Sequence, residues 1–123
     1  MLLQETIFVA IMPKKMSPGA LSEHALELVA ARFKALSELS RLKLIIALEE
    51  GEKNVTTLVE ETGLTQANVS RHLQTLIEAG ILARRKEGLS VMYSIADATI
   101  FDLCEQVCGG VQKRVEKQAN AFR

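Results

Sequence analysis

Residues 55–95 read VTTLVEETGLTQANVSRHLQTLIEAGILARRKEGLSVMYSI, and this stretch decides the fold. It begins with a short apolar face made by Val55, Leu58 and Val59, at the spacing of one side of a helix. Gly63 follows, and glycine tolerates the left-handed backbone geometry that is common at helix C-termini. The pattern therefore predicts a short helix that ends in a tight turn.

A second, longer helix is predicted after Thr65, whose side chain can accept a hydrogen bond from a free amide at the helix start. Its apolar positions recur at i, i+4, i+7 and i+8, namely Val69, Leu73, Leu76 and Ile77. The other side and the leading end carry Gln66, Asn68, Ser70, Arg71, Gln74, Thr75 and Glu78. Short amides and hydroxyls with one arginine can bond base edges and phosphates. An ordinary amphipathic helix would show the same apolar stripe. The flanking segments are therefore needed to distinguish a DNA-recognition helix from an ordinary one.

A β-hairpin is predicted after this helix. Apolar residues alternate with the period of a half-buried strand at Val91, Tyr93 and Ile95. Three cations lead into a turn signal at Glu87 and Gly88. Two helices joined by a tight turn and followed by a hairpin are typical of a winged helix-turn-helix, which places one helix in the DNA major groove. The predicted contacts to double-stranded operator DNA are Thr65, Gln66, Asn68, Ser70, Arg71, Gln74, Arg84, Arg85 and Lys86.

Composition agrees with one compact domain, since 48% of the 123 residues are hydrophobic. The formal net charge is zero, but the charges are unevenly distributed. Residues 65–95 hold four cations and two anions, whereas residues 49–61 hold five glutamates and one lysine. A mildly positive face set against an acidic one suits reversible, salt-sensitive DNA binding. With no Trp and one Tyr, the chain offers little aromatic surface for stacking on single-stranded bases.

Helices are also predicted on both sides of residues 55–95. The spacing of apolar residues indicates a first helix at 20–36, a second at 40–50 and a last at 97–118. The core side of the second helix is predicted to be Leu42, Ile45, Ile46 and Leu48. In the first helix, Arg32 interrupts the apolar stripe, and we expect its stem to lie along the stripe with the charged head in water.

Residues 20–119 are predicted to form the domain, between a loose arm at 1–19 and a tail at 120–123. The arm holds both prolines, and its short apolar run has neither the charge order of a signal peptide nor the length of a membrane span. A cytoplasmic protein without a membrane partner is therefore expected. The fold class is mostly α with a small β-hairpin wing, about five helices and two strands. Long terminal helices in a fold of this size are commonly buried in a two-fold dimer, so a homodimer is expected.

Three segments carry a resemblance to a known family: FKALSELSRLKLIIALEEGE at 33–52, GLTQANVSRHLQTLIEAGIL at 63–82 and RRKEGLSVMYSI at 84–95. They resemble the ArsR/SmtB-type family of small winged-helix repressors, over about half the chain at motif level. The resemblance implies a homodimer with the first and last helices at the interface. It also implies an operator that is repressed until a metal, metalloid or reactive sulfur species binds.

The predicted recognition helix matches the family by position. Gln66, Ser70 and Arg71 stand where the family contacts bases and phosphates. Arg71 replaces a histidine and Ala67 a serine that many relatives carry, so the operator preference is open. His72 is expected near a phosphate or in solvent.

The best-known metal sites of the family are not matched. One uses closely spaced cysteines before the recognition helix, where residues 54–58 hold neither thiol nor histidine. A second uses carboxylates and histidines on the last helix, and Asp97 matches one ligand. The other positions hold Thr99, Gly110 and Lys113. Thiol sensors of the family pair a cysteine on the second helix with one on the last, and the second helix has none.

Cys104 and Cys108 are the two cysteines of the chain, and their spacing places them on one face of the last helix. Parallel side chains make a disulfide within that helix awkward. Two such helices packed antiparallel across a dimer axis would gather up to four thiols. Such a cluster suits a soft metal, a metalloid such as arsenite, or an intersubunit disulfide or persulfide bridge. In the alternative interpretation, both cysteines are small structural residues and the protein has no inducer site.

An enzyme and a protein-binding module are the two other classes of function to weigh against DNA binding. An enzyme is not predicted, because the sequence shows no Ser/His/Asp constellation, no phosphate-binding glycine loop and no CxxC motif, and no cofactor is required. A winged helix that contacts only other proteins is the third interpretation. It predicts that the face formed by residues 66–74 tolerates mutation, whereas a DNA-binding face would not.

Overall fold

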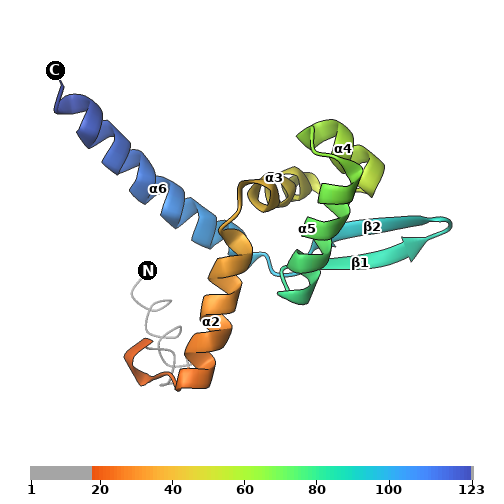
Figure 1. The fold of residues 1–123 in the computed structure, drawn as a ribbon, viewed down its shortest axis with the longest axis horizontal. Coiled ribbons are helices and arrows are strands. Elements are labelled where there is room, and N and C mark those ends of the chain that lie inside the picture. The colour runs from red at the N-terminus through yellow and green to blue at the C-terminus, as the bar shows by residue number, and fades with distance from the viewer. Residues whose placement is uncertain (1–17, 123) are drawn as a thin grey trace, which may run out of the picture.

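Figure 1 shows the fold in a computed structural model that describes residues 18–122. Its elements, in chain order, are α2 (Glu23–Leu36), α3 (Leu39–Ala47), α4 (Val55–Thr62), α5 (Gln66–Glu78), β1 (Leu82–Glu87), β2 (Ser90–Ile95) and α6 (Thr99–Asn120). Short 3₁₀ turns lie at Pro18–Ala20 and Leu48–Glu50. The predicted fold class, a mostly α winged helix-turn-helix with five helices and two strands, is confirmed.

Short polar side chains set where the helices begin. The side chains of Ser22, Asn54 and Thr65 each accept a hydrogen bond from the backbone N–H three residues later, at 3.2, 2.9 and 3.2 Å. Each bond satisfies an amide group that the first turn of a helix leaves without a partner. Gly63 ends α4 with a φ of +73°, a conformation that favours glycine. The capping residue and the turn predicted before α5 are thus confirmed.

One apolar core lies where α3, α4 and α5 pack together, and the start of the hairpin and the first turn of α6 complete it (Figure 1). Its fully buried side chains are Leu44, Ile45, Leu48, Leu58, Val69, Leu73, Leu76, Ile81 and Ile100. The stripe predicted on α5 contributes three of these residues, and the fourth, Ile77, packs against them in a partly buried position. Because this stripe faces the core, the opposite side of α5 faces outward.

The hairpin forms by antiparallel pairing of β1 and β2. Pairing continues as far as Glu87, opposite Ser90. The sequence pattern had placed the basic residues 84–86 between the two strands. That prediction was wrong, because all three are paired within β1. Lys53 fixes the hairpin to the body, because its backbone N–H and C=O both bond the backbone of Tyr93, at 3.0 and 2.9 Å.

Four predicted helix boundaries were wrong by two or three residues, one of them the end of the last helix, which lies at Asn120 and not at 118. The first helix begins at Glu23, because Pro18–Ala20 form a separate 3₁₀ turn. α3 ends at Ala47, where the backbone tightens into the 3₁₀ turn Leu48–Glu50. The last helix begins at Thr99. Helix ends are the part of a sequence-based assignment that depends most on local backbone geometry.

The predicted arm at residues 1–19 falls almost entirely outside the described residues, so it stays a prediction. At the other end, α6 extends to Asn120 and a turn follows it. Within residues 18–122, no helix has both the length and the apolar character needed to cross a membrane.

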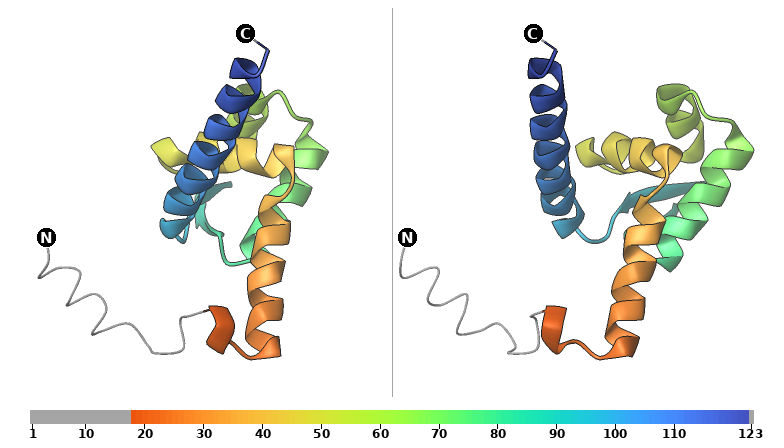
Figure 2. Two further views of the ribbon diagram at one scale, coloured as in Figure 1. Left: turned by 90° about the vertical axis from the view of Figure 1, so that its left-hand side faces the viewer. Right: turned by 60° about the vertical axis from the view of Figure 1, so that its left-hand side comes forward.

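Apolar side chains remain uncovered on α2 and α6. α6 projects from the body, and the right-hand view of Figure 2 shows most of its length standing clear of α4, α5 and the hairpin. The exposed apolar residues of the two helices are Leu26, Leu28, Val29, Phe33, Val107, Val111 and Val115. An apolar groove of about 670 Å³ lies between α2, α3 and α6. Ile46 lines it and is 65% exposed, so its predicted place in the core was wrong: this side of α3 faces the open groove.

Candidate nucleic-acid interface

Polar residues project from the outward side of α5. Gln66, Ser70, Arg71 and Gln74 are exposed, and Asn68 is half-buried. We call these five residues the α5 ridge. Thr65 is also exposed, but its hydroxyl is used as the helix cap. The structure thus brings the predicted helical contact residues together on one surface.

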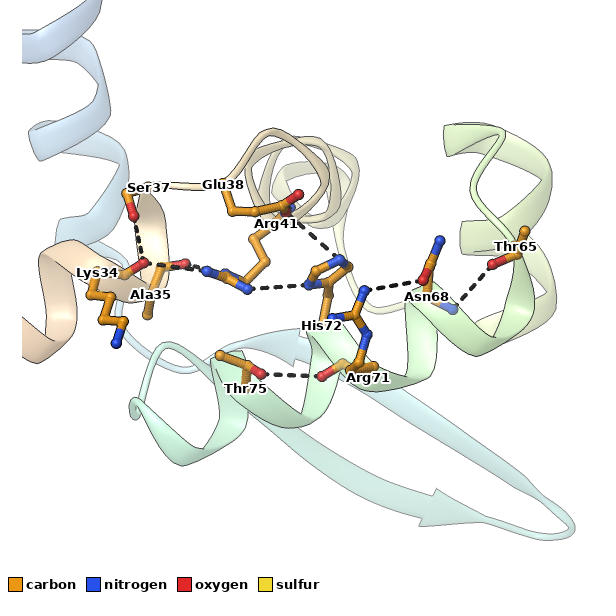
Figure 3. A network of polar contacts seen from close by, with 10 residues as sticks. All are labelled: Lys34, Ala35, Ser37, Glu38, Arg41, Thr65, Asn68, Arg71, His72 and Thr75. Carbon is orange, nitrogen blue, oxygen red and sulfur yellow. Dashed lines mark hydrogen bonds and ion pairs between the residues drawn. The ribbon is translucent and has the colours of Figure 1, made fainter.

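Hydrogen bonds between neighbouring turns order the α5 ridge. Nη2 of Arg71 donates to Oδ1 of Asn68 at 3.1 Å, and Nε2 of Gln74 donates to Oε1 of Glu78 at 3.2 Å (Figure 3 shows the first of these). An arginine has five N–H donors, so one such bond leaves Arg71 with donors free for a base edge or a phosphate. Arg71 is consequently both oriented and available.

The three cations of β1 are not equivalent. Neighbouring residues of a strand point to opposite faces, so Arg85 faces away from Arg84 and Lys86. Arg85 forms ion pairs with Glu52 and Glu87. The hydrogen bond to Glu52 is the main reason that the pKa of Arg85 is raised, and the same contact lowers the pKa of Glu52. Arg84 and Lys86 are therefore better placed for phosphate contacts than Arg85 is.

His72 lies behind the α5 ridge, and its predicted location near a phosphate or in solvent was wrong. The residue is only 4% exposed, and its Nδ1 lies 3.2 Å from Nη1 of Arg41 on α3 (Figure 3). Burial is the main cause that lowers the pKa of His72, although the charge of Glu38 opposes this shift. Sequence reasoning missed Arg41 and Glu38 altogether. The sequence feature that could have indicated this contact is the position of Arg41, three residues before the buried Leu44 on a helix that packs against α5.

Arg32 was also placed wrongly by the sequence, because its head is bound and does not extend freely into water. Its guanidinium pairs with Asp97 and donates to the backbone oxygen of Ala79 at 3.1 Å. Asp97 accepts in addition from the backbone N–H of Thr99 at 3.0 Å. Hydrogen bonds from Thr99 and Arg32 lower the pKa of Asp97. Both carboxylate oxygens therefore have protein partners.

The predicted sensor residues lie away from the α5 ridge, on α6. Cys104 is half-buried and Cys108 exposed, both thiols are free, and both line the apolar groove. Burial raises the pKa of Cys104, and the neighbouring Cys108 adds to the effect. Across residues 18–122, no three His, Cys, Asp or Glu side chains are grouped as a metal site would need.

Comparison with known proteins gives a consistent result. The family model described as "Bacterial regulatory protein, arsR family" matches residues 39–84. The probable mercury resistance operon repressor of Streptomyces lividans is 37% identical over 71 residues, which span 58% of this chain and 57% of that protein. The HTH-type transcriptional regulator NmtR of Mycobacterium tuberculosis is 33% identical over 86 residues, which span 70% of this chain and 72% of that protein.

A solved structure agrees with the sequence relatives. The homodimeric winged helix-turn-helix DNA-binding domain of a possible ArsR-family regulator from Mycobacterium bovis superposes with a TM-score of 0.68 at 27% identity. The match covers 88% of this chain and 94% of that one. Sequence, fold and the outward polar face of α5 lead to the same assignment: the chain belongs to the ArsR family of bacterial regulatory proteins and is a winged helix-turn-helix transcriptional regulator.

Proposed function

We propose that this protein represses transcription in the cytoplasm as a homodimer that inserts the α5 ridge of each copy into the major groove of a pseudo-palindromic operator. The observation that carries the proposal is the two-sided character of α5. Gln66 and Arg71 are exposed, while Val69 and Leu73 on the same helix are fully buried. A glutamine can pair with adenine and an arginine with guanine or a phosphate. Because the buried side of α5 is fixed in the core, the exposed side chains of the α5 ridge are held in place on the surface, where they can contact base edges.

The wing adds contacts that do not depend on sequence. Arg84 and Lys86 are exposed on β1, on the opposite face from the paired Arg85. Contacts of this kind orient a protein on the duplex and make its affinity depend on salt. We expect these two cations to contact the phosphates beside the groove that α5 occupies.

A second copy is the proposed cover for the apolar faces of α2 and α6. Phe33 on α2 and Val107 on α6 line the apolar groove and are 52% and 54% exposed, and Val111 and Val115 continue the exposed stripe along α6. An exposed, contiguous apolar surface of this kind is typical of a site of protein association. A two-fold dimer would present two ridges to half-sites about 34–36 Å apart, one turn of DNA. The interface helices proposed here are those that the resemblance implied.

Release from the operator is proposed to occur through Cys104 and Cys108. Both thiols line the apolar groove, so a change in their chemistry would alter the surface on which dimerisation is proposed to depend. A soft metal or metalloid would bind the thiols with loss of their protons. Hydrogen peroxide would convert two thiols into a disulfide and two waters, and an organic persulfide would transfer one sulfur to a thiol and leave as the organic thiol.

DNA binding is tested by fluorescence-polarisation titration of the protein with duplex DNA from upstream of its own operon, at several salt concentrations. Arg71→Ala should weaken binding by about 1–3 kcal/mol if Arg71 reads a base. Lys113→Ala is the matched control, since it removes one exposed cation from α6, far from the ridge, and should leave the affinity unchanged. If the unmodified protein does not bind the duplex, a purely protein-binding winged helix becomes the better description. If it binds and both variants bind equally well, Arg71 is not a DNA contact.

The sensor is tested by exposing the protein to arsenite, an organic persulfide and peroxide. Intact mass spectrometry would identify the adduct, and the DNA titration would report release. The double variant Cys104→Ser, Cys108→Ser should bind the operator normally and no longer respond to any of the three. A double variant that is still released would show that the cysteines are structural, without affecting the DNA-binding proposal.

A further inference from the structure

A polar network behind the α5 ridge joins α5 to α3 and to the end of α2 (Figure 3). His72 is its central member, and it is the one buried polar residue among those the structure describes. Its neighbour in sequence, Arg71, points outward on the ridge. His72, which makes the interior contact of α5, is thus adjacent in sequence to Arg71, which is a proposed DNA contact.

Arg41 connects three helices through one guanidinium group. Its Nε donates to the backbone oxygen of Ala35 at 2.6 Å, and its Nη2 donates to that of Lys34 at 3.3 Å. These carbonyls belong to the last turn of α2, where helical hydrogen bonds run out and a cation is favoured. Nη1 of Arg41 makes the remaining contact, to Nδ1 of His72 at 3.2 Å.

The contact defines the protonation state of His72. A guanidinium group can only donate, so Nδ1 must be the acceptor, and the neutral ring carries its proton on Nε2. Nε2 lies 3.7 Å from Oε2 of Glu38, a carboxylate that also accepts from the backbone N–H of Arg41 at 3.0 Å. A protonated ring would lose the bond from Arg41 and would place a second cation against the guanidinium.

We propose that neutral His72, held by Arg41, is a positioning residue that fixes the orientation of α5 for operator binding without itself touching DNA. The proposal rests on the proposed function, because it assigns the α5 ridge to DNA. It goes further by making the affinity depend on a contact on the interior side of the helix. Since Arg41 also bonds the end of α2, the same contact relates the ridge to the helix proposed for dimerisation.

The energetic reason lies in the burial of His72, whose ring is 4% exposed, while its contact with Arg41 is partly buried. Water can replace a lost bond only incompletely at such a site, so either part of the cost of the lost bond remains or the helix shifts until a new partner is found. Either result changes where Arg71, one residue away, lies relative to the duplex. Misplacement of a contact group lowers affinity even when the group itself is intact.

The first test compares two substitutions of His72 in the full-length protein. His72→Leu keeps the volume but removes the acceptor, and we expect operator affinity to fall about tenfold or more. His72→Asn keeps an acceptor at the position of Nδ1 and should restore most of that loss. Dimer mass, measured by analytical ultracentrifugation, should be unchanged in both. The salt dependence should also be unchanged, because no phosphate contact is lost.

The second test uses pH. The charged groups that face His72 are Glu38 and Arg41 from α3 and its N-cap, and Arg71 from α5. Burial lowers the pKa of His72, so the operator affinity of the unmodified protein should weaken only as the pH falls through that lowered pKa, below the ordinary histidine value of 6.5. His72→Asn should lose this dependence. His24→Asn should retain it, because the His24 side chain is 81% exposed on α2.

The sign of the pH effect separates two roles for His72. A histidine beside a phosphate would strengthen DNA binding when it becomes charged, whereas the positioning role requires the affinity to weaken. Full operator affinity of a folded His72→Leu variant would overturn the proposal, and so would stronger binding by the unmodified protein in acid. If His72→Leu fails to fold, Arg41→Lys provides the same comparison, since it keeps the charge but cannot make all three contacts. A failure of the unmodified protein to bind would instead overturn the proposed function.

Discussion

The two parts of this chain treat their apolar residues in opposite ways. Around α3, α4 and α5, large side chains such as Leu44 and Leu73 are fully buried within the single chain. On α2 and α6, Phe33 and Val111 remain 52% and 56% exposed, although they lie on regular apolar stripes. The hydrophobic contribution to stability is proportional to the apolar area removed from water. The first part therefore obtains most of its stability from its own contacts, and the second part has stability left to gain from association.

The largest effect is expected for a cavity in the first part. Leu73→Ala should lower the free energy of unfolding by about 2–5 kcal/mol, because this side chain is fully buried between α5 and its neighbours. Urea denaturation at fixed protein concentration measures the change. Leu89→Ala, at the fully exposed hairpin tip, is the matched leucine control and should stay within about 0.5 kcal/mol. Equal losses of unfolding free energy in the two variants would contradict the view that the core around α3, α4 and α5 carries most of the stability of the single chain.

A charge introduced on the exposed apolar face of α6 should weaken dimerisation and leave the fold of the single chain unchanged. Val111→Asp should weaken dimerisation at least about a hundredfold, because an unpaired carboxylate is costly to bury in an apolar interface. Analytical ultracentrifugation would show the shift to monomer, while circular dichroism should report the same helix content at low temperature. Gln112→Asp, one residue further along α6, introduces the same charge at an exposed polar position and should leave the dimer intact. A dimeric Val111→Asp variant would place the interface elsewhere.

The wing allows a comparison within one strand. Arg84→Ala and Lys86→Ala should each reduce the slope of log affinity against log salt by about 1, the effect of one lost phosphate contact. Arg85→Ala should reduce it less, because Glu52 and Glu87 already pair with this cation. Glu52→Gln should then increase the slope, since it removes one of the two carboxylates that pair with Arg85. Equal slopes for all three alanine variants would show that these ion pairs open on DNA.

The smallest expected effect is the pH dependence of stability. The folded chain lowers the pKa of His72, so below its ordinary value of 6.5 the unfolded chain binds more protons than the folded one. The free energy of unfolding should accordingly fall as the pH drops from 7 through about 6, and this part of the change should be absent in His72→Asn. Parallel urea titrations at each pH would measure it. A stability that rose in this window in the unmodified protein alone would be inconsistent with a buried neutral imidazole.

Local rules were sufficient for the elements of the DNA-reading part. Thr65 before an apolar stripe and Gly63 in the turn each act within a few residues, and both behave as their chemistry requires. The alternation at Val91, Tyr93 and Ile95 likewise identified β2. These features depend on hydrogen bonds and periodicity along one segment, which are visible in a sequence.

Contacts between distant segments could not be predicted in the same way. His72 and Arg41 are 31 positions apart, and the pattern on α5 alone could not show that an arginine would meet the ring from α3. Ile46 was assigned to the core because it is apolar, yet the chain leaves its side of α3 open. A stripe in the sequence records which residues avoid water, but it does not record whether the same chain or a second molecule covers them.

Arg32 has a mechanical consequence that follows from the position of its two partners. Ala79 ends the helix that carries the ridge, and Asp97 stands at the root of α6, seven residues before Cys104. A single rigid, planar group therefore spans the trailing end of one helix and the base of the other. If α6 tilts at its root, either α5 must follow or this bridge must open. The backbone N–H of Ala96 also donates to the backbone oxygen of Ile81 at 2.9 Å, so the base of α6 and the end of the reading helix are coupled by both side-chain and backbone bonds.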